Sequence, residues 1–338
     1  MKSIRNSFYS NLTFFNLLYS YNKTKVGKSY VFEVLFFEYN LEINLVNLLN
    51  SIATFNYKIG SYKSFIIYEP KKRVIRCLPF IDRVVQTWYV EFFLKPFFVP
   101  RFIYDSYACI ENKGTHKAIF RLKYFMNKMR NKYNDYYIIK LDISKFFESI
   151  DKDILFNILS KKINDKYLLN FTYNMIYSNK DKGIPIGNYS SQYFANIYLN
   201  ELDYYVKFNL KIKYYCRYMD DFIILVKDKS TARNIYNSIE RFLFDKLKLK
   251  LNPKSKYFPN KEGCNFLGFI IYEDYILLGN RIKKNIYKKI KVWNYLYSNG
   301  NLDIRKFILS YNSYVGHIKH ASSYYFKCNI DNKILFKK

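Results

Sequence analysis

The spacing of hydrophobic and polar positions changes along the chain, and each change predicts a switch between helix and strand. Apolar residues recur at helical spacing through roughly the first 55 residues. Two short runs of β-branched and aromatic residues follow, and "SFIIYEP" and "RVIRCLPF" predict strands. A helical pattern returns after Asp82, between Pro79 and Pro96. The first part of the chain is thus predicted to consist of helices and a pair of strands.

The middle of the chain alternates between the two periods. Residues 136–141, "YYIIKL", predict a strand that ends at Asp142, and a helix with Asp151 as its N-cap follows. A turn-rich loop at 183–191 precedes another helix, and residues 214–226, "YYCRYMDDFIILV", predict a β-hairpin. The apolar faces of the two helices are predicted to be formed by Ile154, Leu155 and Ile158, and by Phe194, Ile197, Leu202 and Val206.

After the hairpin the pattern predicts one more helix and two short strands. The helix covers residues 231–247, and "LKLKLN" and "CNFLGFIIY" predict the strands. The last ~60 residues are basic and mostly helical, with "RIKKNIYKKIK" as their most positive segment. A strand, helices, a hairpin, a helix and a strand in this order predict a layered α+β fold. The apolar face of the 231–247 helix is predicted to be formed by Ala232, Ile235, Ile239, Phe242 and Leu243.

Composition narrows the class of function. The 338 residues suffice for two or three domains, and 50% hydrophobic and 21% aromatic residues argue against a disordered chain. A formal net charge of +29 exceeds what solubility requires and favours a nucleic-acid partner. No apolar run approaches the ~18 residues of a membrane span. The N-terminal segment also lacks the small-residue cleavage site of a signal peptide. We therefore expect a cytoplasmic protein with no membrane partner.

The cysteines and histidines do not predict a metal site. The five cysteines form no C-x-x-C pair and are odd in number, which favours buried free thiols in a reducing compartment. His317 and His320 have the spacing H-x-x-H, but only Cys328 lies near them as a further ligand. A zinc site there is disfavoured because too few ligands are at hand.

Three aspartates suggest a site for a different kind of metal ion. Asp142 ends one predicted buried strand, and Asp220 and Asp221 lie at the tip of the hairpin. If these strands are neighbours, the three carboxylates repel one another unless a cation lies between them. Oxygen ligands favour Mg²⁺ or Mn²⁺ over zinc, and two such ions serve phosphoryl transfer without a covalent nucleophile. The alternative is that Asp142 caps a helix and the other two form an exposed turn.

The surrounding motifs decide between these interpretations. "YMDD" between apolar strands resembles the active-site hairpin of reverse transcriptases, and "IIKLDISKFFESID" resembles that family's other catalytic block. "GIPIGNYSSQYFANIYLNELD" resembles the block between them, "LNPKSKYF" and "CNFLGF" the two that follow, and "EPKKRVIRCLPFIDRVVQ" the fingers blocks. Six blocks in the family's order, over roughly residues 56–275, make an accidental resemblance very improbable.

The resemblance implies a right-hand polymerase fold of the α+β class, with a ferredoxin-like palm and a helical thumb. The N-terminal helices and fingers are expected over residues 1–135. The palm is expected over 136–275, with a fingers insertion at roughly 152–185, and the thumb over 276–338.

It also implies roles for the residues of the catalytic blocks. Asp142 and Asp220 are expected to hold two Mg²⁺ ions, or Mn²⁺, with the carbonyl of Ile143 as a further ligand. Asp221 completes the triad more loosely. Phe147 falls where the family places an aromatic steric gate against ribonucleotides. Lys145 and Phe146 are assigned to the same nucleotide site, although one of the two phenylalanines is expected to be core.

Other blocks imply contacts to the triphosphate and the primer. Lys71 and Arg73 match the fingers positions that hold the triphosphate, with Lys72 as a competing candidate. The alternative for each is a solvated basic patch. Lys254, or Lys256, falls where the family has a lysine near the departing pyrophosphate.

Primer contacts are expected from the hairpin and from "FLGF". Tyr218 and Met219 are predicted to lie beneath the primer end and not in the core. The resemblance assigns a primer grip to Phe266, Leu267 and Gly268, for which an ordinary core strand is the alternative.

One loop departs from the common family pattern. Ile186 and Gln192 replace the glutamine and proline of Q-G-x-x-x-S-P, and Gly187 is kept. This I-G-x-x-x-S-Q form resembles the reverse transcriptases of diversity-generating retroelements, as does "SYVGHIKHASSYY" near the end. Isoleucine cannot hydrogen-bond an incoming nucleotide as glutamine can, so base selection is expected to loosen. That subfamily implies a small basic accessory protein as a partner.

The sequence thus predicts an RNA-directed DNA polymerase that uses template RNA, a primer and deoxynucleotides, with error-prone synthesis. Three alternatives remain open. They are a phage-defence or other cellular reverse transcriptase, a catalytically idle RNA-binding scaffold, and an RNA-dependent RNA polymerase. The last ranks lowest, because such enzymes usually carry G-D-D and lack the bulky gate.

Overall fold

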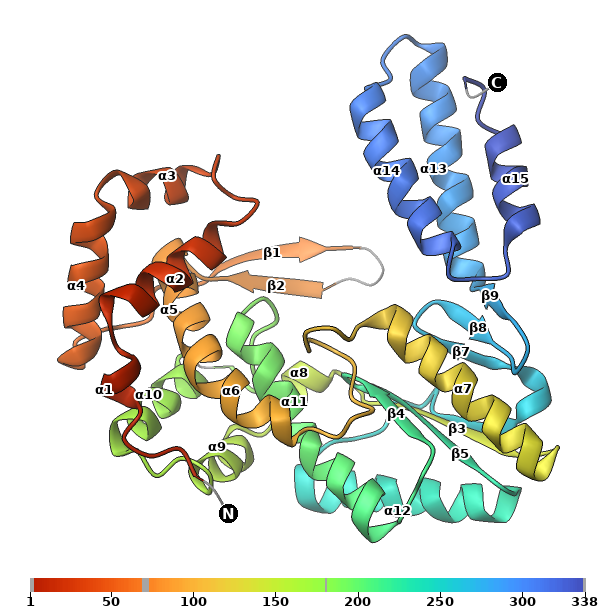
Figure 1. Cartoon of the computed structure of the whole chain (residues 1–338), viewed down its shortest axis with the longest axis horizontal. Helices are drawn as coiled ribbons and strands as arrows, with labels where there is room; N and C mark the ends of the chain where they lie inside the picture. The colour runs from red at the N-terminus through yellow and green to blue at the C-terminus, as the bar shows by residue number, and fades with distance from the viewer. Residues whose placement is uncertain (1–2, 69–72, 180, 337–338) are drawn as a thin grey trace. The chain divides into compact units, whose positions relative to one another are not determined.

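The structure is a computed structural model, and it describes residues 3–68, 73–179 and 181–336. The chain forms two compact units. The first contains residues 1–109, 143–211 and 238–253, and the second contains residues 110–142, 212–237 and 254–338. Each unit is therefore built from segments that are far apart in the sequence (Figure 1).

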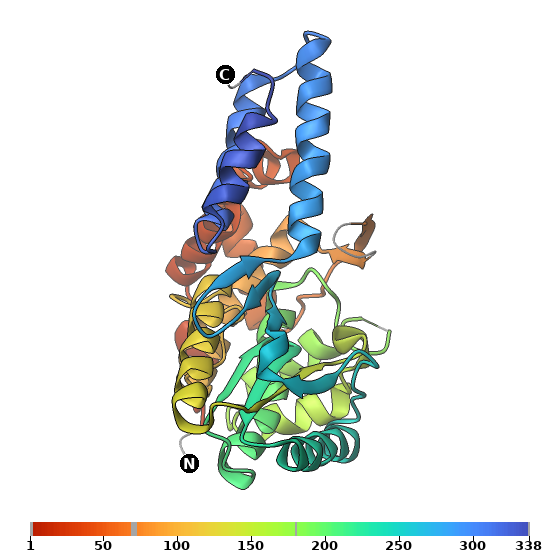
Figure 2. The same cartoon turned by 90° about the vertical axis from the view of Figure 1, so that its right-hand side faces the viewer.

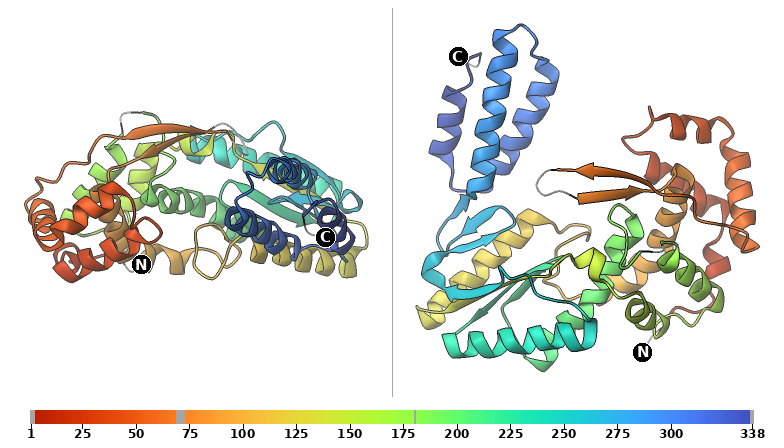
Figure 3. Two further views of the ribbon diagram at one scale, coloured as in Figure 1. Left: turned by 90° about the horizontal axis from the view of Figure 1, so that it is seen from above. Right: turned by 180° about the vertical axis from the view of Figure 1, so that it is seen from behind.

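The first unit is mainly helical, as its N-terminal sequence pattern predicts. Its only strands among the described residues form a two-stranded antiparallel ribbon, β1 (Lys63–Ile67) and β2 (Arg73–Cys77), which is plain in the rear view of Figure 3. The helices of its N-terminal segment are α1 (Phe8–Asn11), α2 (Phe14–Lys25), α3 (Phe32–Tyr39), α4 (Leu41–Ala53), α5 (Phe80–Tyr89), the π-helix η1 (Val90–Leu94), α6 (Lys95–Phe98) and the 3₁₀ turn η2 (Val99–Arg101). Later segments add α8 (Phe146–Ser149), α9 (Lys152–Ser160), α10 (Lys166–Tyr177), α11 (Tyr189–Tyr204) and the π-helix η3 (Tyr205–Asn209).

Aromatic rings form much of the core of the first unit. Trp88 is fully buried, and its ring lies 5.0 Å from Phe93, 5.5 Å from Phe171 and 5.8 Å from Phe8 between centroids. Asp165 joins two segments in this core, because it caps α10 and also accepts hydrogen bonds from the backbone N–H groups of residues 7 and 8. The N-terminal segment is thereby fixed to a part of the chain more than 150 residues away.

The second unit contains a four-stranded antiparallel sheet. Its strands are β3 (Tyr137–Asp142), β4 (Tyr215–Tyr218), β5 (Asp221–Val226) and β6 (Lys256–Pro259), in the order β4-β5-β3-β6. Numbered along the chain, this is the order 4-1-3-2 of a ferredoxin-like sheet read from the other edge. Helix α7 (Thr115–Tyr133) packs against β4 and β5. Helix α12 (Lys229–Leu247) connects β5 to β6 and continues from the second unit into the first.

The C-terminal segment of the second unit adds a small sheet and three helices. After the 3₁₀ turn η4 (Asn260–Glu262), strands β7 (Cys264–Phe266), β8 (Phe269–Ile271) and β9 (Ile276–Leu278) form an antiparallel meander. Helices α13 (Asn280–Ser298), α14 (Ile304–Ile318) and α15 (Tyr324–Asn332) follow and lie alongside one another (Figures 1 and 2). The buried ring of Trp293 joins α13 to α14, since it meets Phe307 edge-on at 4.9 Å.

Most of the predicted elements are present, and two details are wrong. Asp151 caps α9 as predicted, through its carboxylate and the N–H groups of residues 153 and 154. The buried face of α9, however, consists of Leu155 and Leu159, while Ile154 and Ile158 are half-buried. "LKLKLN" forms no strand. It makes only an isolated bridge from Leu251 to Ile143, because α12 extends to Leu247 and too few residues remain for a ladder.

Candidate active site

The hairpin of β4 and β5 brings the predicted aspartates to one end of the sheet. In the register of β3 with β5, Asp142 lies directly opposite Asp221, and Asp221 in turn lies opposite Tyr218 of β4. Opposite residues of an antiparallel pair point to the same face of the sheet. Asp220 occupies the turn between β4 and β5. The predicted convergence of strand ends is therefore confirmed at the level of the backbone.

The turn is held by residues that the sequence pattern did not single out. Met219 has a φ of +55°, a left-handed conformation that is unusual for a side chain of its size. The fully buried Arg217 donates a hydrogen bond of 3.1 Å from Nη1 to the carbonyl of Met219. Met219 is only 9% exposed, which contradicts the expectation that it lies outside the core. Tyr218 is half-buried, and a contact of either residue with a primer remains a prediction.

Ser255 fixes the end of β3. Its hydroxyl accepts a hydrogen bond of 3.1 Å from the N–H of Asp142 and donates one of 3.3 Å to the carbonyl of the same residue. These two hydrogen bonds satisfy the backbone of Asp142 beyond the end of the β3–β6 ladder, whose last pair is Lys140 with Lys256. The neighbouring Lys254 is exposed, and its place near a departing pyrophosphate remains a prediction.

A lysine lies beside the carboxylates. Nζ of Lys140 is 4.0 Å from Oδ2 of Asp221, and it also donates a hydrogen bond to the carbonyl of Asn265 on β7. No group of three or more histidine, cysteine, aspartate or glutamate side chains in the described part of the chain is arranged to hold a metal ion. The side chains of Asp142, Asp220 and Asp221 offer carboxylate oxygens as ligands. Such oxygens suit Mg²⁺ or Mn²⁺, so the chemistry of these residues fits these ions.

The segment after Asp142 belongs to the first unit, and it separates the two phenylalanines as the sequence predicts. Phe146 is 2% exposed and is core, whereas Phe147 is half-buried. The carbonyl of Phe147 accepts a hydrogen bond of 2.9 Å from the N–H of Ile184. Lys145 is exposed and has a φ of +45° at the N-cap of α8.

The loop that carries Ile186 docks on the β1–β2 ribbon. The N–H of Arg76 donates a hydrogen bond of 2.8 Å to the carbonyl of Ile186. Gly187 has a φ of +124°, and a Cβ there would lie 2.3 Å from the carbonyl oxygen of Arg76, so only glycine fits. Ile186 itself is half-buried, and its side chain is therefore partly accessible.

The same loop lines a cavity of about 330 Å³ in the first unit. Gly187 and Gln192 contribute to its wall, together with Lys28 and Arg83. Burial and the neighbouring Arg83 lower the pKa of Lys28. The cavity therefore has positively charged side chains that suit an anionic ligand.

The remaining predicted residues lie in the ribbon and in the small sheet. Lys71 and Lys72 fall outside the described residues. Arg73 begins β2 and is exposed. Phe266 is fully buried at the end of β7, while Leu267 and Gly268, with φ of +52° and +89°, form the tight turn to β8.

The structure brings together three histidines that the sequence pattern treated separately. The imidazole of His116, in the first turn of α7, stacks on His320 at 3.5 Å and lies 5.7 Å from His317 between centroids. Nε2 of His116 and Nε2 of His317 are buried without a hydrogen-bond partner among the described residues. Burial lowers the pKa of both rings, and the neighbouring histidines lower it further. The H-x-x-H spacing was visible in the sequence, but the distant His116 was not.

The match to a family decides the identity of the fold. The family "Reverse transcriptase (RNA-dependent DNA polymerase)" matches residues 63–271. The chain belongs to the reverse transcriptase family. The matched segment contains all three aspartates, the Ile186 loop and the β7–β8 hairpin.

Two of the curated relatives are named as intron proteins. The putative COX1/OXI3 intron 2 protein of Saccharomyces cerevisiae is 26% identical over 234 residues, which cover 50% of this chain and 27% of that protein. Protein YkfC of Escherichia coli is 24% identical, with 55% and 60% covered. The group II intron-encoded protein LtrA of Lactococcus lactis is 24% identical, with 60% and 44% covered. The chain thus spans between about a quarter and three fifths of the length of these relatives.

Solved structures confirm the predicted fold class. A structure of telomerase from Candida albicans in complex with a TWJ fragment of telomeric RNA aligns with a TM-score of 0.51 at 12% identity. The alignment covers 84% of this chain and 61% of that one, and it supports a right-hand polymerase fold.

In the described part of the chain, no helix is both long and apolar enough to cross a membrane. Among the five cysteines, all within the described residues, Cys216 and Cys264 are buried as predicted, whereas Cys77 and Cys328 are half-buried and Cys109 is exposed.

Proposed function

We propose that this protein is an RNA-directed DNA polymerase that extends a primer on an RNA template. The observation that carries the proposal is the β3–β5 register, which sets Asp142 opposite Asp221 with Asp220 in the adjoining turn. Membership of the reverse transcriptase family supplies the reaction class. The primer 3′-hydroxyl attacks the α-phosphorus of a deoxynucleotide, a P–O bond forms to the primer, and the bond to the β-phosphate breaks. Pyrophosphate leaves, and the proton of the hydroxyl passes to solvent.

Asp142 and Asp220 are the side chains that hold Mg²⁺ in this proposal, with the carbonyl of Ile143 as a further ligand and Asp221 as a looser one. When bound, two such ions neutralise the attacking and leaving oxygens. The chain's own part is to fix the carboxylates. Ser255 does so for the backbone of Asp142, and Arg217 does so for the turn that carries Asp220.

The other residues select and position the substrate. Phe147 excludes a ribose 2′-hydroxyl, and its backbone is held by Ile184. Lys71 and Arg73 contact the triphosphate, Lys145 and Lys254 supply further positive charge, and Phe266, Leu267 and Gly268 support the primer. Within this proposal, fingers, palm and thumb correspond to residues 1–135 with 152–185, to 136–275, and to 276–338.

Primer extension tests the reaction. The purified chain is incubated with an RNA template, an annealed DNA primer, Mg²⁺ and either deoxynucleotides or ribonucleotides. We expect extension with deoxynucleotides. Asp220→Asn should reduce it by about 10³-fold or more, because a ligand of the Mg²⁺ ions that would stabilise the transition-state charge is lost. Extension that prefers ribonucleotides contradicts the proposal, and so does an Asp220→Asn variant with full activity. An idle RNA-binding scaffold gives no extension in either case.

We further propose that the synthesis is error-prone and serves sequence diversification, with a small basic accessory protein as a partner. Support comes from Ile186, which stands where many relatives have glutamine and which Arg76 and Gly187 hold against the ribbon. Ile186→Gln is expected to lower the error rate, with Gln192→Pro in the following helix α11 as the variant at the other position that departs from the family pattern. Sequencing of the extension products measures this, and equal error spectra for Ile186→Gln and the parent protein contradict the proposal.

A further inference from the structure

Lys140 is placed on the catalytic face of the sheet by the pleat of β3. Side chains two positions apart on a strand point to the same face, so Lys140 and Asp142 share one face. The register of β3 with β5 pairs Lys140 with Ile223 and Asp142 with Asp221, which makes Lys140 the diagonal neighbour of Asp221. The distance of 4.0 Å from Nζ of Lys140 to Oδ2 of Asp221 agrees with that placement.

A second contact joins the same ammonium group to the other sheet. Nζ of Lys140 donates a hydrogen bond to the carbonyl of Asn265, in the middle of β7. Strand β7 leads directly into the Leu267–Gly268 turn. Lys140 also acts electrostatically on Cys264 of β7, whose pKa burial raises to about 12. One side chain therefore connects the catalytic hairpin to the hairpin assigned to the primer.

We propose that Lys140 is a positioning residue of the polymerase site, which holds Asp221 against β7 and lowers the site's affinity for divalent cations. The inference rests on the proposed polymerase function for its site, but not on any measured turnover. Lys140 is 27% and Asp221 24% exposed in their side chains, so the pair is partly shielded from solvent. A fixed positive charge at this distance repels a second cation and occupies one oxygen of the carboxylate that would bind it.

The inference explains why Asp221 is the looser ligand. The ammonium of Lys140 offsets part of the negative charge of Asp221 before any cation binds. Binding of a divalent cation must compete with this ion pair, and Lys140 thereby sets the cation concentration that the enzyme needs.

Calorimetric titration of Mn²⁺ into the full chain, without nucleic acid, tests the inference apart from activity. Lys140→Gln removes the charge but keeps a hydrogen-bond donor on the side chain. It is expected to bind Mn²⁺ about three- to tenfold more tightly than the parent protein. Lys140→Arg is expected to stay within about twofold of the parent protein, because the charge is kept. Lys261→Met, which removes a lysine paired with Asp135 elsewhere in the same unit, controls for net charge and is expected to have no effect.

A double-mutant cycle assigns the effect to Asp221. In an Asp221→Asn background, Lys140→Gln is expected to change the Mn²⁺ affinity less than about twofold, since the interaction partner is already gone. Lys140→Met is measured in parallel, and thermal unfolding shows that each variant is folded. An unchanged or weaker Mn²⁺ affinity in folded Lys140→Gln overturns the inference, as does the same gain in the Asp221→Asn background.

A different result would contradict the proposed metal ligands. If Asp142→Asn binds Mn²⁺ as the parent protein does, the carboxylates are not the binding site and the proposed function loses its mechanism. If Asp142→Asn abolishes binding while Lys140→Gln leaves the affinity unchanged, the polymerase site stands and only the role of Lys140 is rejected.

Discussion

Phe146 and Phe147 are adjacent in sequence but differ in what they contact. Phe146 is buried in the core at 2% exposure, while Phe147 is half-buried and its carbonyl is bound by Ile184. Gly183 packs against this backbone so closely that a Cβ would lie 2.3 Å from the carbonyl oxygen of Phe147. The position of the Phe147 backbone is thus fixed independently of its ring, which is what a steric gate requires.

Substitution of the two rings therefore has different expected effects. Phe147→Ala should raise ribonucleotide incorporation relative to deoxynucleotide incorporation by about tenfold or more, because space opens where a 2′-hydroxyl would lie. Phe146→Ala should instead lower the free energy of unfolding by about 3–5 kcal/mol, as expected for a truncated core phenylalanine. Competitive primer extension and urea unfolding measure the two effects. A Phe147→Ala variant that still rejects ribonucleotides would show that Phe147 is not the gate.

At the scale of elements, the contact of α7 with the end of α14 depends on neutral imidazoles. His116 comes from α7, His317 from α14, and His320 follows α14 directly. Phe269 of β8 lies 4.5 Å from His317, so the surroundings are partly apolar. Three protonated rings at these distances would repel one another.

This contact predicts a pH dependence of stability. The pKa of His116 and of His317 is lowered in the folded state, so the unfolded chain binds more protons below its own pKa of about 6.5. Stability is therefore complete above about pH 6.5 and falls as the pH drops from there toward the folded pKa values. Urea unfolding between about pH 7.5 and 5.5 measures this. His116→Gln combined with His317→Gln should flatten the profile, and an equally steep profile in that variant would assign the effect to other groups.

The elements also show what sequence could predict. The strands that carry Asp142 and the aspartate pair follow from apolar runs and turn residues, and the family motifs give their order. Diagonal and inter-sheet contacts do not follow, because Lys140 meets Asp221 only through the register, and Ser255 meets Asp142 where a ladder ends. His116 was missed for the same reason, since nothing near it in sequence indicates the other two histidines. The burial of Met219 was mispredicted because the sequence does not show that the buried Arg217 donates a hydrogen bond to the carbonyl of Met219.

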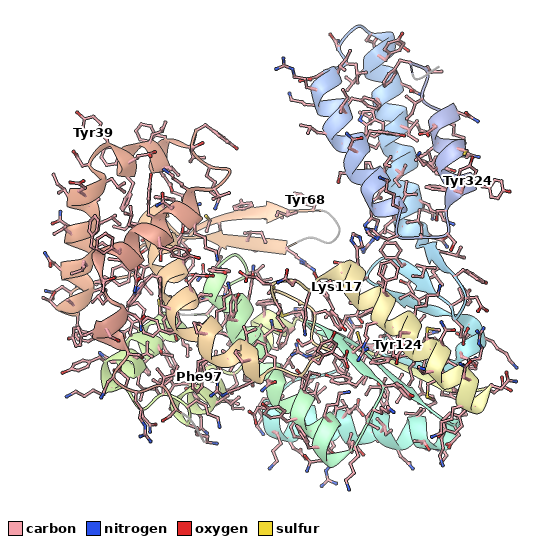
Figure 4. All side chains as sticks on the ribbon, viewed as in Figure 1. Tyr39, Tyr68, Phe97, Lys117, Tyr124 and Tyr324 are labelled. Atoms are coloured by element: carbon pink, nitrogen blue, oxygen red, sulfur yellow. The ribbon has the colours of Figure 1, made fainter. Side chains whose placement is uncertain are left out.

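At the scale of the whole molecule, charge and exposed aromatic rings are the features that bear on nucleic acid. The formal net charge is +29, and aromatic side chains lie on the surface of each unit, for example Tyr39 at the end of α3 with 87% exposure and Tyr324 on α15 with 74% (Figure 4). Cationic side chains bind phosphates without sequence preference, and exposed rings can stack on bases.

These features predict a strong salt dependence of binding to single-stranded RNA. Affinity should fall about a hundredfold between about 50 and 200 mM salt, the loss expected when roughly five phosphates are neutralised. Fluorescence anisotropy with a labelled oligonucleotide measures the slope, and the same titration with a neutral-backbone oligonucleotide is the control. A slope near zero would mean that the positive charge reflects only the overall amino-acid composition and that the basic side chains do not form a nucleic-acid-binding surface.

The crowding at Gly187 has a practical consequence for engineering of this protein. A side chain at position 187 would collide with the backbone of Arg76, whereas Ile186 and Gln192 are both half-buried and accessible to change. A mutagenesis library that aims to tune copying accuracy should therefore randomise positions 186 and 192 and keep position 187 constant. Substitutions at position 187 are expected to disrupt the loop conformation and not to change the error rate in a useful way.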